Sequence, residues 1–152
     1  MIQRNPGKDY RTVIAFCEAL DSNPMVDTDR QTLVDPGLRN ALRNAGWFVS
    51  VVDRAPVFDK DTLLHAFYQA GQFPGYFGFN WDALLDTFCD LEWLGDVNGI
   101  ALIWRNPSVL ASQSPDVFTT FGEVLAEANS TRWRKSLAPL RILAPRVRSA
   151  SL

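Results

Sequence analysis

Residues 100–104 read Ile100-Ala101-Leu102-Ile103-Trp104, five consecutive apolar residues. Short apolar runs of this kind are typical of strands that are buried on both faces. Two further segments have a similar character, Trp47-Phe48-Val49-Ser50-Val51-Val52 and Leu140-Arg141-Ile142-Leu143. Because strands buried on both faces occur mainly in parallel sheets, the three segments predict a small three-stranded parallel sheet.

Segments with helical spacing separate these predicted strands. The first helix has Asp35 as a suitable N-cap, Pro36 at its first position and Gly46 at its end. Three more helices are predicted, one from Asp59 or Asp61 to Gly71, one over residues 80–91 and one over residues 115–129. Strands that alternate with helices favour an α/β domain, in which the helices pack on the parallel sheet.

The chain divides into three parts at this level. Residues 35–145 contain the clear strand and helix patterns and form the predicted folded domain. Residues 1–34 are an N-terminal extension of uncertain structure, whose apolar patch at residues 13–17 fits either a helix or a strand. This extension is expected to cover a sheet edge or to widen a binding surface. Residues 146–152 form a predicted flexible basic tail.

Composition restricts the class of protein. The 152 residues suffice for one domain, and 47% hydrophobic with 21% charged residues is typical of a folded chain. No apolar run is long enough for a bilayer, and the first residues lack the pattern of a secretory signal. We therefore expect a cytoplasmic protein without membrane association. Cys17 and Cys89 are interpreted as reduced core residues, since two cysteines make neither a disulfide framework nor a zinc site, and no cofactor is predicted.

The net charge of −2 conceals an uneven distribution. Between residues 61 and 104 there is no lysine or arginine but there are six acids, Asp61, Asp82, Asp86, Asp90, Glu92 and Asp96. From residue 128 onward the six charged residues are all basic, Arg132, Arg134, Lys135, Arg141, Arg146 and Arg148. The sequence thus has an acidic middle and a basic C-terminal segment.

Residues 73–93 combine an aromatic loop with an acidic helix. Pro74-Gly75 predicts a turn, and Asn80 is a good N-cap for the helix that follows. One face of that helix carries apolar residues that we expect in the core, Trp81, Leu84, Leu85, Phe88 and Leu91. Another carries a row of aspartates four residues apart, Asp82, Asp86 and Asp90.

The aspartate row is unfavourable for the helix, because like charges four residues apart cost roughly 0.2 to 0.5 kcal/mol a pair. Asp82 lies in the first turn, where a negative charge favours the helix dipole without any partner. Asp86 lies deeper and has no basic residue three or four positions away, which favours a binding role over a merely solvated face. Tyr76 and Phe79 are expected to flank this row, since exposed rings beside charges are common anchors of protein interfaces.

The block Tyr76-Phe77-Gly78-Phe79-Asn80-Trp81-Asp82-Ala83-Leu84-Leu85-Asp86, with Phe73-Pro74 before it and Leu102-Ile103-Trp104-Arg105 after it, resembles the barstar family. The resemblance runs from about residue 38 to residue 143. Members of this family are small ribonuclease inhibitors. The resemblance implies a barstar-like inhibitor domain over residues 35–145 that is monomeric when free. It also implies a one-to-one complex in which the acidic helix enters the cleft of a basic ribonuclease. A cleft that attracts RNA is lined with cations, so carboxylates can occupy the places of phosphates.

The resemblance also implies which residues contact the partner. The family's binding tyrosine corresponds to Tyr76, its two helix aspartates to Asp82 and Asp86, and a further acid to Glu127. Asp86 would be the central anchor. Two departures alter the contact surface, because Phe79 stands where barstar has an acid and Leu85 where it has a tryptophan. The six predicted partner-binding residues are Tyr76, Phe79, Asp82, Leu85, Asp86 and Glu127. The departures suggest an immunity protein matched to a different nuclease toxin.

Three alternatives remain. Catalysis is disfavoured, because the sole histidine, His65, lies among apolar residues and is interpreted as a structural or surface residue. We therefore predict that the protein is not an enzyme. The basic segment around Trp133 could instead bind a protein, or bind RNA by stacking and phosphate pairing, although no direct nucleic-acid contact is expected. An immunity protein directed against a toxin that is not a ribonuclease is the third possibility.

Overall fold

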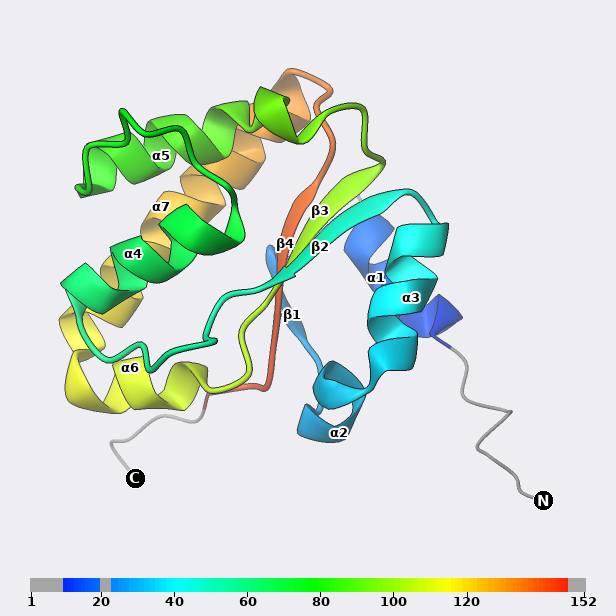
Figure 1. Ribbon diagram of the computed structural model, residues 1–152, viewed down its shortest axis with the longest axis horizontal. Coiled ribbons are helices and arrows are strands. Elements are labelled where there is room, and N and C mark those ends of the chain that lie inside the picture. Colours follow the sequence, from blue (N-terminus) through cyan, green and yellow to red (C-terminus); the bar gives the residue numbers. More distant parts are fainter. Residues whose placement is uncertain (1–9, 20–22, 148–152) are drawn as a thin grey trace.

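A four-stranded parallel sheet forms the centre of the molecule (Figure 1). The computed structural model describes residues 10–19 and 23–147. The strands are β1 (Met25–Asp27), β2 (Trp47–Val51), β3 (Gly99–Ile103) and β4 (Leu140–Ala144), and they are arranged in the order β1-β4-β3-β2. The predicted α/β class and parallel sheet are confirmed, but the sheet has four strands rather than three. The additional strand, β1, has three residues, too few to give a periodic pattern in the sequence.

Helices cover both faces of the sheet. One face carries α1 (Arg11–Glu18), α2 (Arg30–Val34) and α3 (Pro36–Asn44), and the other carries α4 (Lys60–Ala70), α5 (Trp81–Asp90), α6 (Pro107–Gln113) and α7 (Pro115–Arg134) (Figure 1). A single 3₁₀ turn, η1 (Glu92–Leu94), follows α5. The apolar patch at residues 13–17, for which sequence left helix and strand open, lies within α1.

Alternate residues of the central strands enter two separate cores. Ile100 and Leu102 pack under α4 to α7, whereas Ala101 and Ile103 pack under α1 to α3. This alternation is the expected geometry of a strand, since neighbouring side chains point to opposite faces. Both cores are apolar, which explains why β3 reads as an uninterrupted apolar run. The larger core is rich in aromatic rings, among them Phe67, Phe73, Phe77, Phe88, Trp104 and Phe121.

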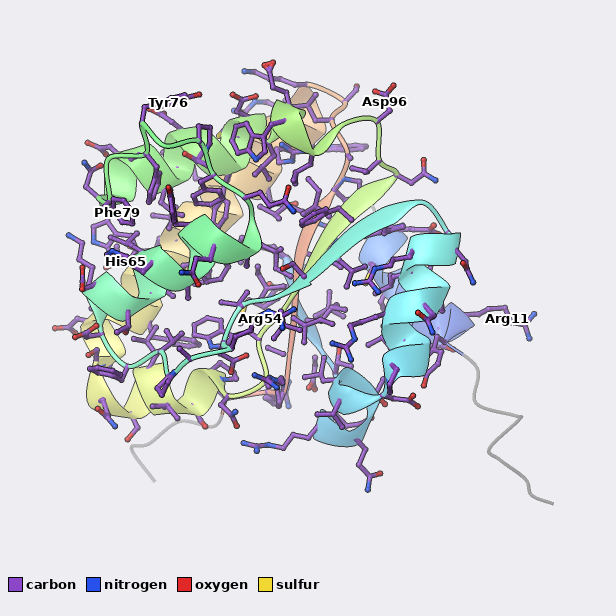
Figure 2. All side chains as sticks on the ribbon, in the orientation of Figure 1. Arg11, Arg54, His65, Tyr76, Phe79 and Asp96 are labelled. Carbon is purple, nitrogen blue, oxygen red and sulfur yellow. The ribbon has the colours of Figure 1, made fainter. Side chains whose placement is uncertain are left out.

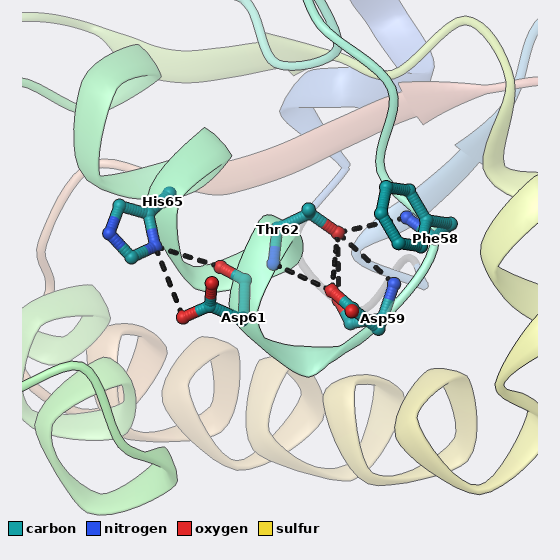
Figure 3. A network of polar contacts seen from close by, with 5 residues as sticks. All are labelled: Phe58, Asp59, Asp61, Thr62 and His65. Atoms are coloured by element: carbon teal, nitrogen blue, oxygen red, sulfur yellow. Dashed lines mark hydrogen bonds and ion pairs between the residues drawn. The ribbon is translucent and has the colours of Figure 1, made fainter.

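Side-chain caps define where three of the helices begin, as predicted. The Asp35 carboxylate accepts from the Gly37 N–H at the start of α3. At α4, the Asp59 side chain accepts from the Thr62 N–H, and the Thr62 hydroxyl accepts from the Asp59 N–H (Figure 3). At α5, the Asn80 side-chain oxygen accepts from the Ala83 N–H at 2.8 Å.

The fourth predicted helix is longer than expected, and α6 was not predicted. The last turn of α7 is held by Arg132, which is 3% exposed and donates to backbone carbonyl groups. Its Nη1 lies 2.9 Å from the Asp90 carbonyl oxygen and 3.2 Å from that of Phe88, and its Nε lies 2.9 Å from that of Ala138. Arg132 therefore joins α7 to the C-terminal end of α5. Apolar periodicity could not show this contact.

A second buried arginine holds the other side of the sheet. Arg141 on β4 is 1% exposed, with Nε 2.9 Å from the Cys17 carbonyl oxygen and Nη2 2.7 Å from that of Ala19. Its Nη1 donates to the Asn129 side-chain oxygen at 2.6 Å. Since a buried guanidinium needs several acceptors, this network ties α1 and α7 to β4, an interior strand of the sheet.

Two features of composition can be compared with the structure. Cys17 is buried and Cys89 half-buried, and both are free, so the expectation of a core position is wrong in part for Cys89. Within residues 10–19 and 23–147, no helix combines the length and the apolar character that crossing a bilayer requires.

Candidate protein-binding site

The acidic row lies on the outer surface of α5. Asp82, Asp86 and Asp90 are exposed, while Leu84 and Phe88 on the inner face are fully buried. The helix is amphipathic because its inner residues pack against α7 and the aromatic core. The expectation that the whole apolar arc lies in the core is wrong for two residues of that arc. Trp81 and Leu85 are only half-buried and stand at the edge of the acidic surface.

The chain does not neutralise the two carboxylates nearest the loop. In the part of the molecule that the structure describes, no ion pair and no side-chain hydrogen bond involves Asp82 or Asp86. Asp90 differs, because its carboxylate accepts from the Glu92 N–H at 3.2 Å. Asp82 and Asp86 therefore present their full charge to solvent, on a helix that is fixed at its N-cap and at its C-terminal end.

The aromatic loop separates into anchors and exposed rings. Phe73 and Phe77 are each 6% exposed, and their ring centroids lie 4.9 Å apart. Tyr76 is 83% exposed, and Figure 2 shows it projecting from the loop. Phe79 is half-buried and has a left-handed backbone with φ of 52°. The expected division between core rings and flanking rings is thus observed, with Tyr76 far more accessible than Phe79.

Backbone contacts keep this loop in place. The Phe77 N–H donates to the Pro74 carbonyl oxygen at 3.0 Å, which closes the turn at Pro74-Gly75. The Trp93 indole N–H donates to the Gly71 carbonyl oxygen at 2.9 Å and links the loop to η1. Tyr76 is therefore presented by a supported loop, a favourable arrangement for a binding residue.

Glu127 is less closely related to the other predicted residues. It is exposed on α7, the helix that packs against α5. Across the two described ranges it makes no ion pair. Glu127 is related to the other predicted residues only because α7 packs against α5.

Sequence patterns missed a groove at the C-terminal end of α5. The groove has a volume of about 730 Å³ and begins at Asp86. Its lining includes three further acids, Asp90, Glu92 and Asp96, together with Arg132 and Lys135. These acids cluster in the acidic middle of the sequence, but the groove combines them with residues at the end of α7, which sequence patterns do not place beside them. The acidic surface thus continues beyond α5.

The arrangement suits the binding of a cation-rich surface. Among the residues that the structure describes, no cluster of three or more His, Cys, Asp or Glu side chains is arranged to hold a metal ion. Unpaired carboxylates on a rigid helix raise the association rate of a positively charged partner and orient it.

Comparison with known proteins bears on these same elements. The family model described as Barstar (barnase inhibitor) matches residues 47–144. The matched range includes β2, β3, β4 and all helices from α4 to α7, and so contains the acidic helix and the aromatic loop. A search of curated proteins gave no match. Since the model covers well over half of the chain, this protein belongs to the barstar family.

Proposed function

We propose that this protein inhibits a basic ribonuclease by placing α5 in the cleft where the enzyme binds RNA. The observation that carries the proposal is the pair of exposed, unneutralised carboxylates, Asp82 and Asp86, beside the exposed ring of Tyr76. The matched family model carries the description of an inhibitor of barnase, which supports a ribonuclease as the partner.

The physical basis is competition with an anionic substrate. A ribonuclease cleft concentrates Arg, Lys and His side chains, because it must attract a polyanion and stabilise negative charge in the transition state. Asp82 and Asp86 lie one helical turn apart on one face, so both can meet cations in one cleft. The ring of Tyr76 can fill an adjacent hollow, and Phe79 and Leu85 supply apolar contact around the charges.

A biological role follows from the departures at Phe79 and Leu85. We propose an immunity protein that acts in the cytoplasm and forms a one-to-one complex with a nuclease toxin whose surface differs from that of barnase. Helix α5 would enter the cleft, and Glu127 would contact its rim.

The experiment is an RNA-cleavage assay with purified protein. Barnase and a panel of other basic ribonucleases are titrated with the protein, and inhibition should saturate at one equivalent. The association rate should fall steeply with added salt, because screening weakens the attraction between the acidic helix and the cleft. Unchanged cleavage by every enzyme of the panel at tenfold excess would contradict the proposal.

A cellular assay complements the titration. Cells that express a ribonuclease inhibited in vitro should survive when this protein is co-expressed. A gel-shift measurement with the same RNA and no nuclease serves as the control, since loss of cleavage through RNA binding would appear there.

A further inference from the structure

A histidine outside the matched contact residues lies beside the proposed binding surface. His65 is on α4, and its side chain is 55% exposed. Figure 2 shows His65, Phe79 and Tyr76 following one another along the same end of the molecule. The rings of His65 and Phe79 are stacked, with centroids 4.4 Å apart and planes inclined by 29°. His65 is thus joined to the loop that presents Tyr76.

The hydrogen bonds of His65 determine which ring nitrogen carries a proton. Nδ1 lies 2.9 Å from the carbonyl oxygen of Asp61 and 3.5 Å from its carboxylate (Figure 3). Both groups can only accept, so Nδ1 must be the donor. In the neutral ring Nε2 then keeps its lone pair, and within the described ranges it has no hydrogen-bond partner. His65 therefore offers an exposed acceptor at the edge of a stacked pair.

The position of this pair is fixed from several sides. The ring of Phe79 also lies 4.8 Å from Phe77 and 5.0 Å from Tyr68. Phe79 adopts a left-handed backbone, which is unfavourable for a large side chain and persists only where surrounding contacts impose it. A further contact joins α4 to α5, because the Lys60 ammonium lies 5.3 Å from the ring of Trp81. The exposed edge of α4 and the first turn of α5 thus form one continuous surface.

We propose that the nuclease-binding surface extends from α5 onto α4, where Nε2 of His65 accepts a hydrogen bond from an Arg or Lys side chain of the nuclease. The inference rests on the proposed function. The stated donor is chosen by charge, since Asp61 beside His65 is 81% exposed, and the one cation described at this surface, Lys60, lies over the Trp81 ring. A cationic donor meets an acceptor nitrogen, a nearby carboxylate and an aromatic face there.

Two substitutions separate the acceptor from the ring. His65→Phe keeps a ring that can stack on Phe79 but removes the acceptor. His65→Gln removes the ring but places an amide oxygen near the position of Nε2. Arg43→Ala, an exposed change on α3 at the opposite face of the sheet, is the control. Because both sites are exposed, all three variants should keep the thermal midpoint of the wild type.

The probe is the ribonuclease of the panel, barnase included, that the wild-type protein binds most tightly, and the measured quantity is the dissociation constant. A hydrogen bond to a charged donor predicts that His65→Phe weakens binding about tenfold or more, while His65→Gln retains most of the affinity and Arg43→Ala all of it. Wild-type affinity in His65→Phe would overturn the inference and leave the proposed function intact. Equal loss in His65→Phe and His65→Gln would overturn it as well, because the acceptor would then not be the determinant.

The tautomer can be measured without a partner. The ¹⁵N chemical shifts of the His65 ring in the free protein at pH 8 should identify Nδ1 as the protonated nitrogen, and a ring protonated at Nε2 would overturn the inference. Failure of the wild-type protein to bind any ribonuclease of the panel has a different meaning. It would contradict the proposed function, and this inference with it.

Discussion

The acidic stretch at residues 61–104, which contains α5, and the basic segment from residue 128 onward carry six charges each, but they use them in opposite ways. On α5, Asp82 and Asp86 are exposed and without partners in the described part of the molecule. In the basic segment, Arg132 and Arg141 are almost completely buried and donate to backbone carbonyl groups. A guanidinium can be buried in this way because its five N–H donors can satisfy several acceptors together.

The difference shows where binding energy can come from. Charges that are already paired inside a protein stabilise its fold and are not available to a partner. Arg134 is also engaged, since its guanidinium donates to Ser130 and Thr131 on its own helix. Three arginines of the basic segment are thus engaged within the chain, and one of them, Arg132, holds the end of the acidic helix.

The largest effect is expected when the central carboxylate of the acidic row, that of Asp86, is removed. Asp86→Ala should weaken inhibition of a ribonuclease by about 2 to 5 kcal/mol, because cations of the cleft would lose their central partner. The free energy of unfolding should remain nearly unchanged or rise slightly, since repulsion between Asp86 and its neighbours in the row is relieved. Titration of RNA cleavage and urea unfolding measure the two quantities.

Glu123→Ala is the matched control for this prediction. Glu123 is likewise an exposed acid within a helix, on α7. Its removal should leave inhibition unaltered. Equal losses in the two variants would mean that net charge, and not the row on α5, determines binding.

The next largest effect concerns the buried arginines and is measured as a change in the free energy of unfolding. Arg141→Met retains the aliphatic part of the side chain but removes the guanidinium that donates to the carbonyl oxygens of Cys17 and Ala19. We expect a loss of about 3 kcal/mol in the free energy of unfolding, measured with urea, because buried unpaired acceptors are costly. The variant should still inhibit fully at temperatures where it is folded.

Arg134→Met provides the comparison for Arg141→Met. Arg134 is exposed, and its bonds are local to α7. Its replacement should change stability by less than about 0.5 kcal/mol. If Arg141→Met proved equally mild, the buried network would not be a stabilising element.

Sequence patterns were sufficient for the elements that the apolar and capping signals describe. The strands β2, β3 and β4 and the caps at Asp35 and Asn80 follow from local chemistry, while for α4 the pattern left Asp59 and Asp61 as candidates. The fold class follows in turn, because apolar strands separated by helices admit few arrangements. The exposed acidic face of α5 was also predictable, since its period matches that of the helix.

Sequence patterns could not show contacts between distant residues. β1 is recognised only by its pairing with β4, where Met25 lies opposite Ile142. In the sequence, Arg132 and Arg141 resemble ordinary solvated charges. Most of their backbone acceptors lie more than forty residues away along the chain, so only the folded structure shows that the two arginines are paired. The stack of His65 on Phe79 is also a contact between distant residues. The sequence alone therefore indicates only a structural or surface histidine at position 65.

A smaller effect compares two aspartates in equivalent helical positions. Asp82 and Asp116 each lie in the first turn of a helix, α5 and α7 respectively, so each favours the helix dipole. Asp82→Ala and Asp116→Ala should therefore both lower the free energy of unfolding by about 0.5 kcal/mol. Only Asp82→Ala should also weaken inhibition, by about 1 to 2 kcal/mol. Equal inhibition by the two variants would remove Asp82 from the proposed site.

The smallest effect is a pH dependence on the side of the buried arginine. Burial raises the pKa of the Cys17 thiol to about 12 from an ordinary value of 9.0, with the neighbouring Arg141 acting in the opposite direction. Because the folded-state pKa is the higher one, stability is unaffected by this thiol below pH 9 and falls as the pH rises toward 12. Between pH 9 and pH 10 the expected loss is roughly 1 kcal/mol.

Cys17→Ala isolates this contribution to the pH dependence. The variant should be less stable at every pH, because a buried side chain is truncated, but its slope between pH 9 and pH 10 should be shallower than that of the wild type. The interval ends at pH 10 because the Tyr10 hydroxyl, whose pKa burial also raises to about 12 from 10.0, contributes a similar loss above it. Parallel slopes in urea unfolding would show that the Cys17 thiol ionises as readily in the folded protein as in the unfolded chain. In that case the interior around Arg141 would be open to water. Arg141 would then not be a buried charge, and it would no longer contrast with the exposed aspartates of α5.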